Sequence, residues 1–395
     1  MNRRDLLKLA VAAPLAATPL HLFAAPGTGA RVLVVFLRGA YDAANFLVPV
    51  GSDFYYEARP NIAVPKPGSA PVAALPLDAN WALHPALRES LLPLYQQGQL
   101  AFVPFAGTHD ASRSHFSTQD TIELGQAHDR TRDYQSGFLN RLAGVLTGRT
   151  RPISFTSQVP VTFRGETQIP NMALRQLSRP QLGAHQSAVI AQMYRSTSLN
   201  SPVSEGFSVR DGVMQDLAAE MEAASRNALT ARGFELEARR IARLMRDRYN
   251  VGFVDVGGWD THAGQGGAEG YLANRFEQLG RGIAAFAEEA GTAWRDSVVV
   301  VISEFGRTFR ENGNRGTDHG HGSVYWVLGG SVRGGRIAGG QVPVQASTLH
   351  QDRDYPVLSE YRALFGGLFS RIYGLNAAQL ERVFPGTAPL DLALI

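Results

Sequence analysis

The sequence predicts an α/β fold, a three-layer sandwich in which a mostly parallel sheet carries helices on both faces. Short runs of apolar, β-branched residues such as 298–302 are typical of strands buried on both faces of a sheet. Longer segments with apolar residues at helical spacing lie between these runs. Polar clusters rich in Asp, Glu and His directly follow the strands, where open parallel sheets bind ligands.

Five strands are expected in chain order, at residues 31–37, 100–105, 251–256, 298–302 and 323–328. Helical periodicity predicts helices at residues 83–97, from 114 to 124, and at 217–250, 271–290, 361–373 and 377–384. Residues 153–163 and 166–172 indicate short strands or a lid. We expect residues 26–395 to form one domain.

Composition narrows the chemistry that the chain can perform. The 395 residues are 44% hydrophobic and 18% charged, which is typical of a globular protein. The arginines are scattered along the chain, which argues against a nucleic-acid surface. The absence of cysteine excludes disulfides and thiolate chemistry, so carboxylates, imidazoles and hydroxyls remain.

Residues 1–25 have the pattern of a secretory signal peptide. Arg3-Arg4 is followed by an apolar run at residues 9–23, which Pro14 and Pro19 interrupt. The run is too short and too often broken by proline to serve as a stable membrane anchor. The paired arginines before Asp5-Leu6-Leu7-Lys8 resemble a twin-arginine (Tat) signal. We therefore expect the Tat translocase to export the folded chain to the periplasm or beyond.

Polar residues follow the first two predicted strands. Asp42 comes just after residues 31–37 and could be a metal ligand or a helix N-cap. Ser112, Arg113, Ser114 and His115 follow residues 100–105 at a predicted helix start, where backbone N–H groups favour an anion. Ser114 or Ser112 could act as a nucleophile with Arg113 and His115 contacting the oxyanion, or could simply cap the helix.

The third and fourth strand ends carry acids and imidazoles. Asp260 and His262 lie two residues apart, a spacing that places both side chains on one side of an extended backbone. The purely structural alternative is a turn with a capping Asp and a surface His. The last cluster contains Glu304, Asp318, His319 and His321. Oxygen and nitrogen ligands without sulfur suit a divalent metal ion (Zn, Mn, Mg or Ca).

Asp42, Asp260, His262, Asp318 and His319 are the expected ligands of one metal site. Glu304 and His321 are expected as further ligands or as groups that orient the ligands. Arg113 and Arg307 are candidates to bind the anionic group of a substrate through paired hydrogen bonds.

This order of strand-end groups resembles the alkaline phosphatase superfamily, which includes sulfatases. The motifs RRDLLK, SRSHF, GGWDTHAGQ, ISEFGRT and GTDHGHG together resemble the Tat-exported bacterial proteins of domain-of-unknown-function family 1501. The superfamily resemblance implies an alkaline phosphatase-like α/β domain with one or two divalent metals. The sequence departs from the superfamily pattern in three places. Asp260 and His262 are two rather than four residues apart, Glu304-Phe305 replaces an Asp-His pair, and His109 occupies a sulfatase nucleophile position.

The resulting expectation is an exported, metal-dependent hydrolase or transferase that acts on an anionic small-molecule or polymer ester of phosphate or sulfate. A non-catalytic exported binding or assembly protein with a degenerate hydrolase fold is the alternative. A metal-free structural protein is a third interpretation.

Overall fold

The structure, a computed structural model, describes residues 29–127, 131–174, 184–216 and 233–395. The predicted signal peptide, residues 1–25, lies outside the described residues. Residues 217–232, the first part of the helical region predicted at 217–250, also lie outside the described residues. The described part of this region contains helix α10 (Phe234–Asp247). No helix in the described ranges has both the length and the apolar character that a membrane span requires.

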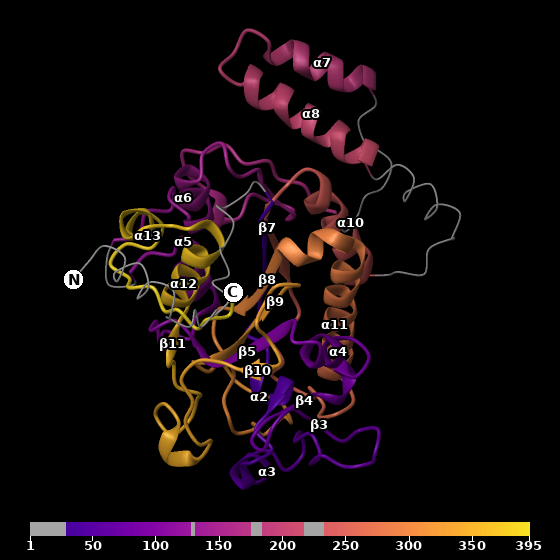
Figure 1. Ribbon diagram of the computed structural model, residues 1–395, viewed down its shortest axis with the longest axis vertical. Coiled ribbons are helices and arrows are strands. Elements are labelled where there is room, and N and C mark those ends of the chain that lie inside the picture. Colours follow the sequence, from indigo (N-terminus) through magenta and orange to yellow (C-terminus); the bar gives the residue numbers. More distant parts are fainter. Residues whose placement is uncertain (1–28, 128–130, 175–183, 217–232) are drawn as a thin grey trace, which may run out of the picture.

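An eight-stranded sheet forms the centre of the molecule (Figure 1). Its spatial order is β10 (Arg336–Ile337), β5 (Leu100–Gly107), β9 (Ser323–Leu328), β8 (Ser297–Ser303), β1 (Arg31–Leu37), β7 (Val251–Val256) and β6 (Pro152–Ser154), while β11 (Ser359–Glu360) also pairs with β5. Strand β9 runs antiparallel to β5 and β8, and the other pairings in this sheet are parallel. The mostly parallel α/β sheet predicted from sequence is confirmed, and the reversed direction of β9 was not predicted.

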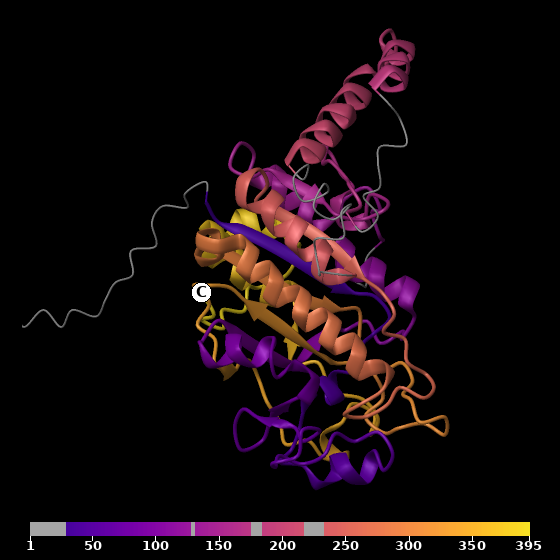
Figure 2. The same cartoon turned by 90° about the vertical axis from the view of Figure 1, so that its right-hand side faces the viewer.

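Helices cover both faces of this sheet because successive side chains of each strand point to opposite sides. In β1, Leu33 and Val35 contribute to one apolar core, whereas Val32 and Val34 contribute to the other. The first core also contains residues of α4 (Leu91–Gln96), α10 and α11 (Tyr271–Ala290). The second contains residues of α5 (His115–Leu124), α6 (Phe138–Val145), α12 (Tyr361–Tyr373) and α13 (Ala377–Val383). Figure 2 looks onto the face that α10 and α11 cover.

The remaining elements lie around these layers. A second sheet has the order β2 (Leu47–Val48), β4 (Ala82–Leu83) and β3 (Leu75–Pro76). The other α-helices in the described ranges are α2 (Ala43–Phe46), α3 (Asp53–Ala58), α7 (Ala184–Tyr194) and α8 (Asn200–Asp216), of which α7 and α8 project from the body in both views (Figures 1 and 2).

Two predicted segments differ from the structure in detail. The helix predicted at 83–97 is instead a 3-10 turn at Pro85–Leu87 and the short α4. Pro85 and Pro93 lack an amide hydrogen, so a helix accepts each of them only in its first turn. Residues 153–163 contain part of β6 and a 3-10 turn at Val161–Phe163.

The topology places the polar segments together. Strands β5, β8, β1 and β7 run in one direction, so their carboxyl ends lie at the same edge of the sheet. Residues 108–115, 257–265 and 304–321 follow three of these ends, and β9 begins at the same edge immediately after the last of them. Segments that are distant in sequence thus contribute to one site.

Candidate metal centre

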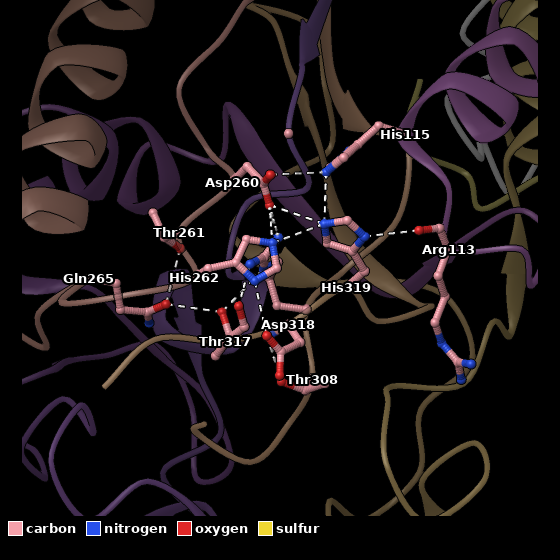
Figure 3. A network of polar contacts seen from close by, with 12 residues as sticks. Arg113, His115, Asp260, Thr261, His262, Gln265, Thr308, Thr317, Asp318 and His319 are labelled. Atoms are coloured by element: carbon pink, nitrogen blue, oxygen red, sulfur yellow. Dashed lines mark hydrogen bonds and ion pairs between the residues drawn. The ribbon is translucent and has the colours of Figure 1, made fainter. Parts of the chain in front are cut away.

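Three imidazoles and one carboxylate converge at this edge (Figure 3). Nε2 of His319 lies 3.0 Å from Nε2 of His115 and 3.1 Å from Nε2 of His262. Oδ1 of Asp260 lies 2.9 Å from Nε2 of His262 and 3.2 Å from Nε2 of His319. Its Oδ2 lies 3.4 Å from Nε2 of His115. We call His115, Asp260, His262 and His319 the imidazole cluster.

The outward nitrogen of each imidazole, Nδ1, faces an oxygen. The three pairs are His115 with Glu304 Oε1 at 2.8 Å, His262 with Asp318 Oδ1 at 2.9 Å, and His319 with the backbone carbonyl of Arg113 at 2.9 Å. A carboxylate or a carbonyl only accepts hydrogen bonds, so each Nδ1 carries the proton. In the neutral ring, Nε2 then presents a lone pair to the centre of the cluster.

Such an arrangement of donors fits a metal ion. Lone pairs and a carboxylate oxygen at contact distance repel one another unless a cation lies between them. Ligand atoms of His115, Asp260 and His319 lie within 4.8 Å of one another. His262 is not part of this set of three, although its Nε2 contacts Asp260 and His319. Three nitrogens and one oxygen favour zinc or a neighbouring transition ion over Mg²⁺ or Ca²⁺, which prefer oxygen ligands.

Local sequence explains how His115 and His319 reach this point. His115 is the first residue of α5, whose N-cap is Ser114. The ring of Phe305 packs against both imidazoles, with its centroid 5.0 Å from that of His115 and 5.3 Å from that of His319. Phe305 therefore packs against two imidazoles of the cluster and helps to hold them in place.

Two glycines allow the segment at 305–308 to lie against the segment at 318–322. A Cβ atom on Gly306 would lie 1.9 Å from the carbonyl oxygen of Gly322, and one on Gly320 would lie 2.4 Å from the backbone of Arg307. The amide of Gly306 donates to the carbonyl of His321, and the amide of Gly320 to that of Gly306, both at 2.8 Å. The glycines of the GRT and GHG motifs are needed for this close approach.

Glu304 lies behind His115 and is fully buried. Its Oε1 accepts hydrogen bonds from Gln119 Nε2 at 2.9 Å and from the amide of Gly39 at 2.8 Å, in addition to that from His115. Burial alone would raise its pKa, but these hydrogen bonds hold the pKa of Glu304 below its usual value. The hydrogen bond to Glu304 in turn raises the pKa of His115. Glu304 is therefore an orienting partner of His115 in this geometry.

Both candidate anion-binding arginines are paired with carboxylates. The buried guanidinium of Arg307 donates to Asp260 Oδ1 at 2.6 Å and to Thr317 Oγ1 at 3.2 Å. Although burial raises the pKa of Asp260, the interactions with Arg307 lower it overall. The Nη2 of Arg113 lies 2.7 Å from Oδ2 of Asp354. The structure thus shows each guanidinium in an ion pair.

Asp42, expected as a ligand, lies outside the cluster in a buried ion pair. Its Oδ2 accepts from Arg59 Nη1 at 2.5 Å and from Gln265 Nε2 at 2.6 Å, and its Oδ1 accepts from Arg59 Nη2 at 3.1 Å. It precedes α2, but its side chain makes no capping hydrogen bond. Both its oxygens are thus already occupied by the protein.

The other predicted site residues have varied surroundings. Asp318 contacts the outer nitrogen of His262 rather than the centre of the cluster. His321 is buried with its ring 4.6 Å from that of His350, and burial lowers its pKa to about 4. Ser114 Oγ accepts from the amide of Ser117 at 3.4 Å, which confirms a capping role, while Ser112 Oγ lies 3.3 Å from Thr118 Oγ1.

Sequence reasoning missed Gln119, Arg59 and Asp354. Gln119 lies four residues after His115 on α5, so helical spacing could have placed it on the same face. Arg59 and Asp354 are both fully buried partners of residues that we did identify, Asp42 and Arg113. Nothing in the sequence around Arg59 and Asp354 predicts that they pair with Asp42 and Arg113.

The cluster is open to solvent on one side. The side chains of Asp260 and His262 are 43% and 44% exposed, whereas that of Glu304 is fully covered. Beside Asp260 and His262 lies a hollow of about 420 Å³ that Arg38, Trp259 and Tyr271 also line. A larger hollow of about 560 Å³, between Phe54 and the segment at 341–345, contains none of the cluster residues. A solute can therefore reach the cluster.

Comparison with known proteins gives a family without an assigned activity. The model of DUF1501, described as a protein of unknown function, matches residues 29–384. Comparison with curated proteins finds no match.

Solved structures that resemble the chain include the following three. A protein in the alkaline phosphatase superfamily from Vibrio parahaemolyticus is 11% identical with a TM-score of 0.36, and the match covers 79% of this chain and 64% of that one. BT1596, a 2-O GAG sulfatase, is 8% identical with a TM-score of 0.41, covering 93% of this chain and 74% of that one. The lipoteichoic acid synthase LtaP from Listeria monocytogenes is 8% identical with a TM-score of 0.38, covering 93% and 76%.

The chain spans less than two thirds of the length of the Vibrio protein. All three likenesses have TM-scores below 0.5, so the α/β fold rests on the strand order of the chain itself.

Proposed function

The chain belongs to the DUF1501 family, and we propose that it is a metal-dependent hydrolase of phosphate or sulfate esters built on the imidazole cluster. The observation that carries the proposal is the shared direction of the three imidazoles. Each donates a hydrogen bond from Nδ1 to an oxygen and turns Nε2 toward the carboxylate of Asp260. Oriented imidazoles of this kind are typical of metal sites.

His115, Asp260, His262 and His319 would hold the ion. When bound, such an ion polarises a phosphoryl or sulfuryl oxygen and activates water. The chain's own residues would then bind and orient the ester. His115 is the first residue of α5, and a helix N-terminus favours an anion.

Hydrolysis adds the elements of water across the bond between phosphorus or sulfur and the alcohol oxygen. The nucleophile is either water or the hydroxyl of Ser114 or Ser112, and the leaving alkoxide takes up a proton. Ser114 is adjacent to His115 in sequence, whereas Ser112 is three residues before it. A serine attack would leave a phosphoserine or sulfoserine, which water then hydrolyses.

A non-catalytic, metal-dependent binding protein is the second candidate. The ion pairs of Arg113 and Arg307 favour it, because neither guanidinium is left without a carboxylate to bind a substrate anion. In this case the cluster would bind a metal and an anionic ligand without turnover.

One experiment separates the two functions. The purified chain is stripped with a chelator, reloaded separately with Zn²⁺, Mn²⁺, Mg²⁺ or Ca²⁺, and assayed with aryl phosphate, phosphonate and sulfate esters. We expect hydrolysis to be lost on stripping and restored by a transition ion. Loaded protein that hydrolyses none of these esters would support the binding protein instead.

We further propose that the chain is exported by the Tat pathway, on the basis of Arg3-Arg4 and the apolar run that follows. Replacing both arginines with lysine should leave the precursor in the cytoplasm. Normal export of that variant would contradict the assignment.

A further inference from the structure

Arg113 has an unusual backbone conformation at the rim of the imidazole cluster. Its φ angle is +52°, in the left-handed region that residues other than glycine rarely adopt. The carbonyl oxygen of Arg113 accepts the hydrogen bond from Nδ1 of His319 at 2.9 Å. Its guanidinium points away from the cluster (Figure 3). The part of Arg113 that meets the cluster is therefore the main chain.

The guanidinium is held by a buried carboxylate. Oδ2 of Asp354 accepts from Nε of Arg113 at 3.0 Å and from Nη2 at 2.7 Å. The same Nη2 donates to Oε1 of Gln351 at 2.8 Å. The side chain of Asp354 is 0% exposed, whereas that of Arg113 is 25% exposed. Paired donors on a buried oxygen fix the direction of the arginine side chain.

Asp354 is attached to the same loop that carries His319. It forms an antiparallel bridge with Thr308, and the amide of Phe309 donates to the carbonyl of Arg353 at 2.9 Å. The amide of Thr308 donates to the carbonyl of Asp318 at 2.8 Å, one residue before His319. The anchor of Arg113 and the imidazole that its carbonyl meets thus share one framework.

We infer that Asp354 and Arg113 are positioning residues for His319. The carboxylate of Asp354 holds the guanidinium, the held side chain keeps Arg113 in its left-handed conformation, and that conformation places the carbonyl on Nδ1 of His319. Nε2 of His319 is thereby left unprotonated and aimed at the metal position. The inference rests on the proposed metal centre, and it assigns to Arg113 a role other than binding the substrate anion.

The roles differ in what a substitution does to metal binding. Without its anchor, Arg113 can relax to a negative φ and withdraw its carbonyl, which frees His319 to rotate or to protonate Nε2. Loss of an orienting partner typically weakens metal binding 10–100-fold. An arginine that acts only on the substrate anion would leave the affinity for metal unchanged.

The experiment measures metal affinity in the full chain, by Zn²⁺ competition against a chromophoric chelator, and the absorption spectrum of the Co²⁺ form. We expect Asp354→Asn and Arg113→Ala to weaken binding about 10–100-fold and to change the Co²⁺ spectrum. Arg113→Gly should lose less affinity than Arg113→Ala, because glycine adopts a positive φ without strain.

Arg353→Ala is the matched control. Arg353 also pairs with Asp354, at 3.1 Å, but the side chain of Arg353 is 38% exposed and its carbonyl accepts from Phe309 rather than from His319. This variant should bind Zn²⁺ with wild-type affinity. Equal losses in Arg353→Ala and Arg113→Ala would overturn the inference, because they would indicate a general effect of the neighbouring charge.

The unfolding midpoint of each metal-free variant is measured in parallel. If Asp354→Asn does not fold, the Arg113→Ala and Arg113→Gly pair decides, since both leave Asp354 with Arg353 as a partner. Wild-type affinity and spectrum in Arg113→Ala would overturn the inference while the metal centre stands. A wild-type chain that binds no metal would overturn both, whereas metal binding without turnover contradicts ester hydrolysis alone.

Discussion

Nε2 of His115 lies 3.0 Å from Nε2 of His319, although 204 residues separate the two histidines in sequence. Each ring has its Nδ1 on an oxygen, so the two inner nitrogens present lone pairs to each other. A proton or a cation must lie between them for the contact to be stable. A metal cation held by His115, Asp260 and His319 would account for this contact.

Glu304→Gln should weaken metal binding without preventing folding. The substitution removes the negative charge of the carboxylate that accepts the hydrogen bond from His115 Nδ1, but it keeps the shape of the side chain. We expect the dissociation constant for Zn²⁺ to rise about 10–100-fold, as for other orienting partners. Glu311→Gln is the control, because Glu311 accepts from the amides of Asn61 and Ile62. Equal affinities in the two variants would remove Glu304 from the account.

Ser114→Ala tests the identity of the nucleophile. If the hydroxyl attacks the ester, this variant should bind metal normally and lose several orders of magnitude in kcat. It should also lose about 1 kcal/mol of stability, because Ser114 caps α5. Ser112→Ala should retain turnover. If both single variants and the double variant stay active while His319→Ala does not, water is the nucleophile.

Asp42→Asn should affect stability rather than the metal. The change leaves the guanidinium of Arg59 buried with no opposite charge, since both side chains are almost fully covered. We expect the free energy of unfolding to fall by about 3–5 kcal/mol, with metal affinity retained in the folded fraction. Asp53→Asn, which removes the partner of the exposed Lys66, should cause no measurable change. A large loss of metal affinity in Asp42→Asn would restore Asp42 as a ligand.

His84 should make the protein sensitive to mild acid. Burial lowers the pKa of His84 to about 4, and the unfolded value is about 6.5. The unfolded chain therefore binds the proton first, so stability is fully present above about pH 6.5 and falls as the pH drops toward 4. The loss from this residue should reach about 3 kcal/mol at pH 4.

Chemical unfolding of wild type and His84→Gln with a chelator present, from pH 7 to pH 4, measures this loss. The free energy of unfolding should fall more steeply with acid in the wild type, because only the wild type has the contribution of His84. All other titrating groups are common to both proteins. Parallel curves would mean that His84 is protonated equally in the two states. His109→Gln, at an exposed histidine, should follow the wild type.

The order of elements was largely predictable from the sequence. Strands β1, β8 and β9 consist mainly of apolar runs, whereas Gly252 and Asp255 interrupt the apolar residues of β7. The bounds of α11, α12 and most of α13 follow from helical periodicity. The direction of β9 was not predictable, because a strand buried on both faces has the same apolar pattern whether it runs parallel or antiparallel.

The candidate site was predictable in its location but not in its pairings. Acidic and imidazole side chains after the strands marked the correct edge of the sheet. Asp42 and His115 have similar settings in sequence, each shortly after a strand and next to a helix start. Only the fold shows that Asp42 meets Arg59 and that His115 meets His319, since both contacts depend on loop conformation.

The metal content of the purified, folded chain tests the central claim most directly. Elemental analysis after metal loading and removal of excess ion should find about one equivalent of Zn²⁺ or a neighbouring transition ion per chain. His115→Ala and His319→Ala should each lose that ion while remaining folded, and His109→Ala should keep it. A folded wild-type chain that retains no transition ion, or that retains it equally in both ligand variants, would contradict the account.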